Sequence, residues 1–175
     1  STGTVGLDNV ITTTNGGTVT ITNGGVLTIA AACNMNLDGA FLQDGAGAVS
    51  TAGDITTTND AVQFDGAVTL TDDITIDTGA GIGNVLFSST VDGDYLLTID
   101  AGTGNVQFDG AVGGVTPLSG LLITASTNID VNSTLDADDE NIDITSDGTV
   151  GLDNVITTTT GGTVTITNGG VLTIA

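Results

Sequence analysis

The densest group of ionisable side chains lies late in the chain, where five carboxylates fall within eight residues. They are Asp136, Asp138, Asp139, Glu140 and Asp143. Carboxylate oxygens are good ligands for Ca2+, and the Asp-x-Asp-x-Glu spacing is similar to that of oxygen-rich calcium loops, although the glycine and twelve-residue pattern of an EF-hand are missing. We therefore predict a calcium site here; the alternative is a set of solvated turn carboxylates with diffuse counterions.

The chain offers few other groups for catalysis. It has no Lys, Arg or His against 21 Asp and Glu residues, so its formal net charge is −21. A base that titrates near neutral pH, a Schiff-base amine and a cationic clamp for anions are therefore all missing. A two-carboxylate mechanism stays chemically open to pairs such as Asp72 and Asp73, but Asp is also the expected residue in tight turns. We predict that the chain is not an enzyme.

The charge also restricts the partners. Nucleic acid and anionic membrane surfaces are repelled by a chain without cationic side chains. We expect no membrane insertion either, because no apolar run approaches the length of a membrane span, although 39% of the residues are apolar. With that apolar content and few helix-forming residues, the chain is predicted to be an ordered all-β protein.

Short apolar–x–apolar triplets recur with a fixed period. The first apolar residues of successive sets are Val62, Val85, Val106, Ile129 and Val150, which are 23, 21, 23 and 21 residues apart. Three short strands in each 21–23-residue period, separated by Gly, Asp and Asn turns, indicate one coil of a parallel β-helix, or β-solenoid. A tandem array of immunoglobulin-like sandwiches is the rival fold. A sandwich, however, has no place for this short period and usually carries core aromatics, whereas this chain has no Trp and one Tyr.

A much longer repeat overlies the short one. Residues 3–30 return at residues 148–175, an offset of 145, with 27 of 28 positions identical and only Asn15 replaced by Thr160. We interpret residues 1–175 as one continuous window of a solenoid. Residues 3–147 form one 145-residue unit of six or seven coils, and residues 148–175 begin the next unit. We expect the two copies to lie on the same faces of the coil and the rod to continue beyond both.

Residues 31–52 interrupt the short period and are predicted to be an irregular insertion. The segment holds Cys33 and Met35, the only Cys and Met of the chain, together with Phe41. We expect these three residues to mediate lateral contacts between chains, with a tolerated surface loop as the alternative. Cys33 has no second Cys for a disulfide and no His for a catalytic pair or a zinc site, so its other interpretation is a small buried apolar residue.

Threonine clusters at residues 12–14, 56–58 and 157–160 suggest one minor alternative. Flat threonine ladders on solenoids can bind ice, but such a face repeats its motif on every coil, and these clusters lie far apart. We favour β-branched residues on a solvated face.

The chain resembles the β-strand repeat proteins of bacterial surfaces in two respects. These are the sequences of its coils, such as GGTVTITNGGVLTIA and NVQFDGAV, and its lack of cationic residues. These include filamentous-haemagglutinin-like adhesins and the repeat passengers of autotransporters. The resemblance covers the whole chain and implies a secreted, cell-surface β-helical rod that self-associates end to end and laterally. Because the 145-residue repeat is nearly perfect, we expect a structural segment of an extracellular fibre, sheath or surface coat. The alternative is the spacer stalk of an adhesin.

Overall fold

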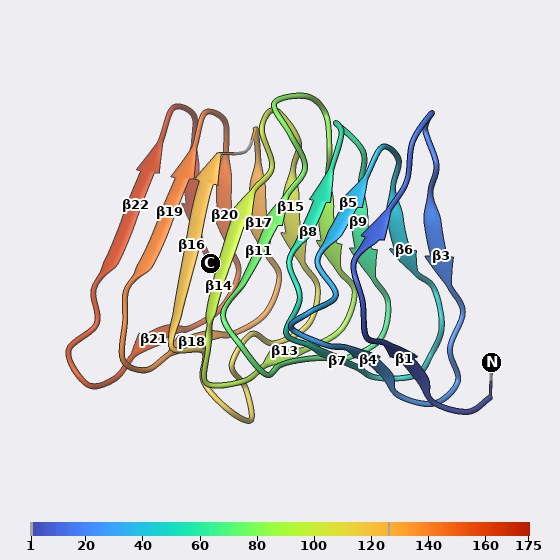
Figure 1. Ribbon diagram of the computed structural model, residues 1–175. Helices are drawn as coiled ribbons and strands as arrows, with labels where there is room; N and C mark the ends of the chain where they lie inside the picture. Colours follow the sequence, from blue (N-terminus) through green and yellow to red (C-terminus); the bar gives the residue numbers. More distant parts are fainter. Residues whose placement is uncertain (1, 126) are drawn as a thin grey trace.

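The computed structural model describes residues 2–125 and 127–175 and confirms an all-β parallel solenoid (Figure 1). The described residues contain no helix, and so none that could cross a membrane. Within this part of the chain, eight coils stack along one axis, each with three strand positions. Every strand pairs in parallel with the equivalent strand one coil away.

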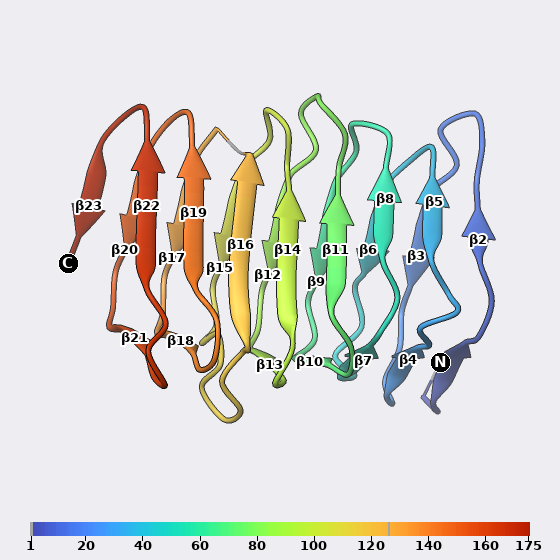
Figure 2. The ribbon, with the colours of Figure 1, turned by 60° about the vertical axis from the view of Figure 1, so that its left-hand side comes forward.

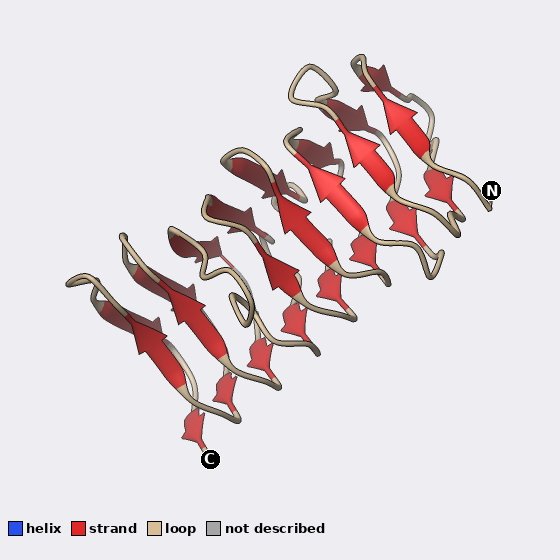
Figure 3. Ribbon diagram, turned by 90° about the horizontal axis from the view of Figure 1, so that it is seen from below, coloured by secondary structure: helices blue, strands red, loops and turns tan. Residues whose placement is uncertain are grey.

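The three strand positions of each coil build three faces, which we call A, B and C (Figures 2 and 3). Face A holds β1 (Val5–Leu7), β4 (Leu27–Ile29), β7 (Val49–Thr51), β10 (Val68–Leu70), β13 (Val91–Asp92), β18 (Leu135–Ala137) and β21 (Ile156–Thr158). Face B holds β2 (Ile11–Thr12), β5 (Met35–Leu37), β8 (Ile55–Thr57), β11 (Ile74–Asp77), β14 (Leu96–Asp100), β16 (Gly120–Ala125), β19 (Ile142–Ser146) and β22 (Val164–Asn168). Face C holds β3 (Val19–Ile21), β6 (Phe41–Gln43), β9 (Val62–Phe64), β12 (Val85–Phe87), β15 (Val106–Phe108), β17 (Ile129–Val131), β20 (Val150–Leu152) and β23 (Leu172–Ile174). Coil 1 is β1–β3 and coil 8 is β21–β23.

Alternation along each short strand fills the core. In β4, for example, Leu27 and Ile29 are buried and Thr28 is exposed, because successive side chains of a strand point to opposite sides. Parallel pairing in register then stacks like on like from coil to coil. On face C, three phenylalanines stack in register and a fourth, two residues out of register in the preceding coil, contacts the first of them, so that neighbouring ring centroids of the column are 5.1–5.3 Å apart. They are Phe41, Phe64, Phe87 and Phe108.

The predicted irregular insertion at residues 31–52 is wrong. These residues form β5 and β6, which pair with strands of coils 1 and 3, and β7, which pairs with β4 and β10 of coils 2 and 4. The apolar–x–apolar signal fails here because polar side chains take inward positions: Gln43 and Thr51 are fully buried. The segment is therefore a regular coil whose core is partly polar.

The irregular part of the stack lies instead at residues 113–119, the loop that projects at the bottom of Figure 2. Here the face A position is split by the loop: Val112 bridges Val91 on one side and Leu135 on the other, and Leu118 bridges Ala137 of β18. The loop exposes 86% of Val115 and is held by Asp92, whose Oδ1 accepts the backbone N–H groups of Val115 and Thr116 at 2.8 and 3.2 Å. An acidic side chain of the preceding coil thus holds the loop that interrupts face A.

The two copies of the repeated sequence lie on different faces. The sequence VGL is β1 on face A and again β20 on face C, and the sequence LTI is β4 on face A and β23 on face C. From β1 to β20 the chain advances nineteen named strands and the single bridged position at Val112, twenty positions in all. With three positions per coil, the 145-residue unit spans six and two-thirds coils. The expectation that both copies share the same faces is therefore wrong, because the unit does not contain a whole number of coils.

Replacing Phe41 tests whether residues 31–52 belong to the core. We expect Phe41→Ala to lower the free energy of unfolding by about 3–5 kcal/mol, because it empties one place in the phenylalanine column. Leu42→Ala on the same strand is the matched control, since Leu42 points outward and is half-buried. Denaturant unfolding measures both variants. Equal, small losses for the two would show that this strand is not packed in the core.

Candidate functional site at the open edges and the acidic corner

The last coil presents an open edge whose apolar side chains are uncovered. Leu172 and Ile174 of β23 are 41% and 68% exposed. Their copies in the first repeat, Leu27 and Ile29, are 0% and 1% exposed. The sequence is the same, so the difference arises from the neighbour: β7 covers β4, whereas nothing in the described chain covers the outer side of β23.

The first coil presents the opposite open edge. Val5 and Leu7 of β1 are half-buried, whereas their copies Val150 and Leu152 are buried between β17 and β23. The chain therefore shows the same residues once with and once without a preceding coil. Together, the β1–β3 edge and the β21–β23 edge are called the open edges.

An apolar recess marks the open edge of coil 8. It is lined by apolar side chains from four strands, β20 to β23. Its lining includes Leu152, Val155, Ile156, Val164, Ile166 and Ile174. In a closed solenoid these inward side chains meet those of the next coil. The recess is thus an unfilled section of the core.

Two buried amides form a polar centre inside coils 1 and 2. The Gln43 Nε2 donates to Asn23 Oδ1 and to the Gly45 carbonyl, both at 2.6 Å, and Gln43 Oε1 accepts the Gly66 N–H at 2.9 Å. The copy of Asn23 in the second repeat, Asn168, keeps its turn hydrogen bond to the Gly170 carbonyl at 2.8 Å. Sequence reasoning missed this centre, and a polar residue in an expected apolar position was the one available signal.

A ladder of asparagines connects coils 4 to 6 and was also missed. Asn84, Asn105 and Asn128 each stand just before a face C strand, and side-chain hydrogen bonds of 3.0–3.3 Å join them in sequence. The signal was present, because Asn precedes the first apolar residue of three successive sets, at Val85, Val106 and Ile129. Such amide ladders stabilise the stacking of coils without any charge.

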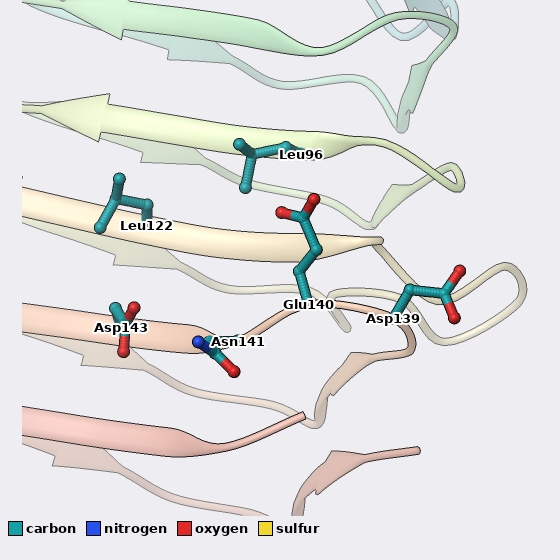
Figure 4. Close-up of a pocket in the computed structure, with 6 residues that line it drawn as sticks. All are labelled: Leu96, Leu122, Asp139, Glu140, Asn141 and Asp143. Atoms are coloured by element: carbon teal, nitrogen blue, oxygen red, sulfur yellow. The ribbon is translucent and has the colours of Figure 1, made fainter. Parts of the chain in front are cut away.

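The five carboxylates of the predicted calcium site spread around one corner, between β18 and β19. Asp136 lies on face A, Asp138, Asp139 and Glu140 form the turn, and Asp143 lies on face B. Figure 4 shows Glu140 reaching toward Leu96, Asp139 pointing away from it and Asp143 farther along β19. Among residues 2–125 and 127–175, no three acidic, Cys or His side chains come together as a metal site. We call residues 136–143 the acidic corner.

Within the acidic corner, Asp138 is held by the following coil. The hydroxyl groups of Thr159 and Thr160 both donate to Asp138 Oδ1, the second at 2.7 Å, and these hydrogen bonds lower the pKa of the Asp138 carboxyl. Thr160 is the one residue at which the two repeats differ. Its backbone φ of 53° is costly for a β-branched residue, while Asn15 adopts φ 58° as Asn does more readily. At this position the threonine makes a hydrogen bond to Asp138.

Asp136 has an unusual environment at the same corner. Its Oδ1 is buried and has no hydrogen-bond partner in the described structure. A buried oxygen without a donor costs free energy because it has left water and found no replacement. Of the five carboxylates, Asp136 therefore carries an evident stability penalty.

The predicted lateral contact through Cys33, Met35 and Phe41 is wrong. All three side chains are at most 1% exposed and belong to the core of coil 2. Burial, and in second place the nearby charge of Asp8, raises the pKa of the Cys33 thiol, which keeps it neutral and unreactive. The segment is inward-facing because Met35 and Phe41 occupy the first inward positions of β5 and β6.

Replacing Asp136 by threonine is expected to stabilise the chain. Asp136→Thr removes the unpartnered oxygen and places a β-branched residue beside Thr157, its partner on β21, so we expect the free energy of unfolding to rise by about 1 kcal/mol. Thermal unfolding with and without Ca2+ at equal ionic strength measures this, with Asp139→Asn as the control at the exposed turn. A calcium site that uses Asp136 would give the opposite result, a variant less stable than the wild type when Ca2+ is present.

Removing one donor to Asp138 is expected to raise its pKa. In Thr159→Val the carboxylate loses the hydrogen bond that lowers its pKa most, so its titration, followed by the carboxyl carbon signal in NMR, moves toward the ordinary value. A depressed folded-state pKa stabilises the fold above the ordinary Asp pKa and ceases to do so as the pH falls through the folded value. This bond therefore makes the free energy of unfolding of the wild type higher than that of Thr159→Val at neutral pH, and the difference disappears in acid. Thr157→Val is the control, and an unchanged Asp138 titration in Thr159→Val would contradict the assignment.

Comparisons with known proteins supply no relative from which a function could be transferred. No family model, no curated protein and no solved structure matches the chain. Function must therefore be inferred from the coils themselves.

Proposed function

We propose that this chain is a non-catalytic structural segment of an extracellular tandem-repeat fibre, sheath or surface coat. One observation carries the proposal: a 28-residue sequence occurs twice with one difference, and its last strand is covered by a further coil in the first copy and uncovered in the second. The open edges at Leu172 and Ile174 and at Val5 and Leu7 fit further coils of the same kind. Such a rod grows by stacking without a new type of interface.

The mechanical properties follow from the ladder. Backbone hydrogen bonds run from coil to coil along the axis, for example from Val5 N–H to the Val26 carbonyl and from Val150 N–H to the Val171 carbonyl, both 2.9 Å. Extension of the rod thus pulls on many parallel bonds at once, while the tightly packed core resists bending. These features support a role in bearing load or holding distance.

The charge supports an assembly that is controlled by ions. A formal charge of −21 without cationic partners makes rods repel one another at low salt, while salt at 0.1 M largely screens that repulsion at separations beyond about 10 Å. Divalent cations between rods would act in the same direction through the exposed carboxylates of the acidic corner. An extracellular medium supplies both conditions, and the resemblance to bacterial surface repeat proteins agrees with that location.

A stalk that holds an adhesive tip is the second candidate. It is favoured by the irregular outer surface: the outward positions of face B change from Thr12 to Asn36, Thr56 and Asp77 in successive coils. Such a surface offers no repeated patch for side-by-side packing. The same variation argues against a regular threonine array for ice.

End-to-end association of the 175-residue chain tests the proposal. We expect concentration-dependent rods at salt that screens the charge, measured by sedimentation velocity and seen by electron microscopy. Leu172→Asp should reduce this association at least tenfold, because it places a charge at an inward position of the open edge. Thr173→Asp adds the same charge on the outward side of β23 and should associate like the wild type under the same salt.

The outcomes separate the candidates. Bundled or sheet-like rods support the fibre or coat, and single rods without lateral contacts support the stalk. A chain that stays monomeric at high salt, or that associates equally well as Leu172→Asp, refutes assembly through the open edges.

A further inference from the structure

The same local turns form at different corners of the coil. In the first repeat, Thr13 Oγ1 donates to the Gly17 carbonyl at 2.6 Å, in the turn that leads from face B to face C. In the second repeat, Thr158 Oγ1 donates to the Gly162 carbonyl at 2.8 Å, in the turn from face A to face B. The turn is therefore determined by its own residues and does not depend on which corner it occupies.

A second turn behaves in the same way. Asn23 Nδ2 donates to the Gly25 carbonyl at 2.7 Å between faces C and A, and Asn168 Nδ2 donates to the Gly170 carbonyl at 2.8 Å between faces B and C. The strand pairing is also the same in the two repeats, since β1 pairs with β4 and β20 pairs with β23 over identical residues. Each of these segments thus keeps its turn and its pairing on two different faces of the coil.

The chain also contains a template for the occupant of each open edge. Residues 31–52 cover β2, β3 and β4 of the first repeat. The copies of those three strands, β21, β22 and β23, are the uncovered strands of coil 8. At the other end, β17, β18 and β19 precede β20, β21 and β22, which are the copies of the uncovered β1, β2 and β3. A second copy of the unit therefore supplies a matching coil at either edge.

We propose that a further copy of the 145-residue unit completes each open edge, and that each copy is rotated by one face of the coil relative to the copy before it. The inference rests on the proposed function and specifies its geometry. Since a unit spans six and two-thirds coils, it advances the rod by about 32 Å at 4.8 Å per coil. Corresponding residues return to the same face only after three units, twenty coils or about 96 Å.

This rotation decides what the surface of the rod presents. The acidic corner, which lies between faces A and B here, lies between faces C and A in the next unit and between faces B and C in the one after. Any neighbour that binds one feature of the unit finds it on all sides of the rod in turn. The rod thus offers lateral contacts in three directions, and none of its sides is specialised.

A longer chain tests the rotation directly. The 175-residue chain is extended at Ala175 by five successive copies of residues 31–175, with Cys33→Ala in every unit. Thr20→Cys, and the same change at each copy of Thr20 such as Thr165, gives one exposed thiol per unit for a small gold label. Cryo-electron microscopy should show labels distributed over three sides of each rod and recurring on any one side every 96 Å or so.

A matched chain labelled only in every third unit is the control and should carry all its labels on one side. A single row of labels about 32 Å apart in the fully labelled chain overturns the rotation and leaves the fibre proposal standing. Failure of the proposed function appears separately, as monomeric behaviour of the 175-residue chain in the association assay. Loss of rods in both experiments refutes the two together.

Discussion

The structure depends on one interaction, the parallel backbone ladder that joins each strand to its equivalent in the next coil. The strands are mostly three residues long, and an isolated strand of that length has no stability in water. A chain without Lys, Arg or His also has no ion pairs to add. The ladder makes these strands stable because it repeats along the whole axis and because register stacks inward apolar residues on one another. The asparagine ladder and the phenylalanine column are side-chain versions of the same repetition.

How much of the fold can be predicted from the sequence depends on what faces inward. Where the inward residues are apolar, as at Val85 and Phe87, the 21–23-residue period correctly predicts coil, strand and direction of pairing. Where Gln43 and Thr51 face inward, the same period is hidden, because the stability of that coil comes from buried hydrogen bonds that have no simple sequence pattern. The interrupted strand position at Val112 and Leu118 is hidden for another reason, since the loop between these two bridged residues breaks the apolar–x–apolar triplet.

The candidate site shows the limit of spacing as evidence. Five carboxylates in eight residues suggest convergence, yet a turn between two faces sends neighbouring side chains in different directions, as Asp139 and Glu140 do (Figure 4). The repeated sequence, by contrast, allows the open edges to be anticipated. It does not show on which face of the coil the second copy of each strand lies. That face depends on the total number of strand positions in the unit, so one misassigned strand position is enough to place residues 148–175 on the wrong face.

The open edges have a consequence for how such a protein acquires its structure. A folded edge presents the hydrogen-bonding groups and the apolar column that the next coil needs, so each completed coil is the nucleus for its successor. The costly step, ordering a first coil with no neighbour, is needed once, and later coils add to an existing surface. A chain of this design that emerges end first, as during export, can therefore fold in the order of its emergence. The edge that looks unfinished in the isolated chain is, in this sense, a growth front.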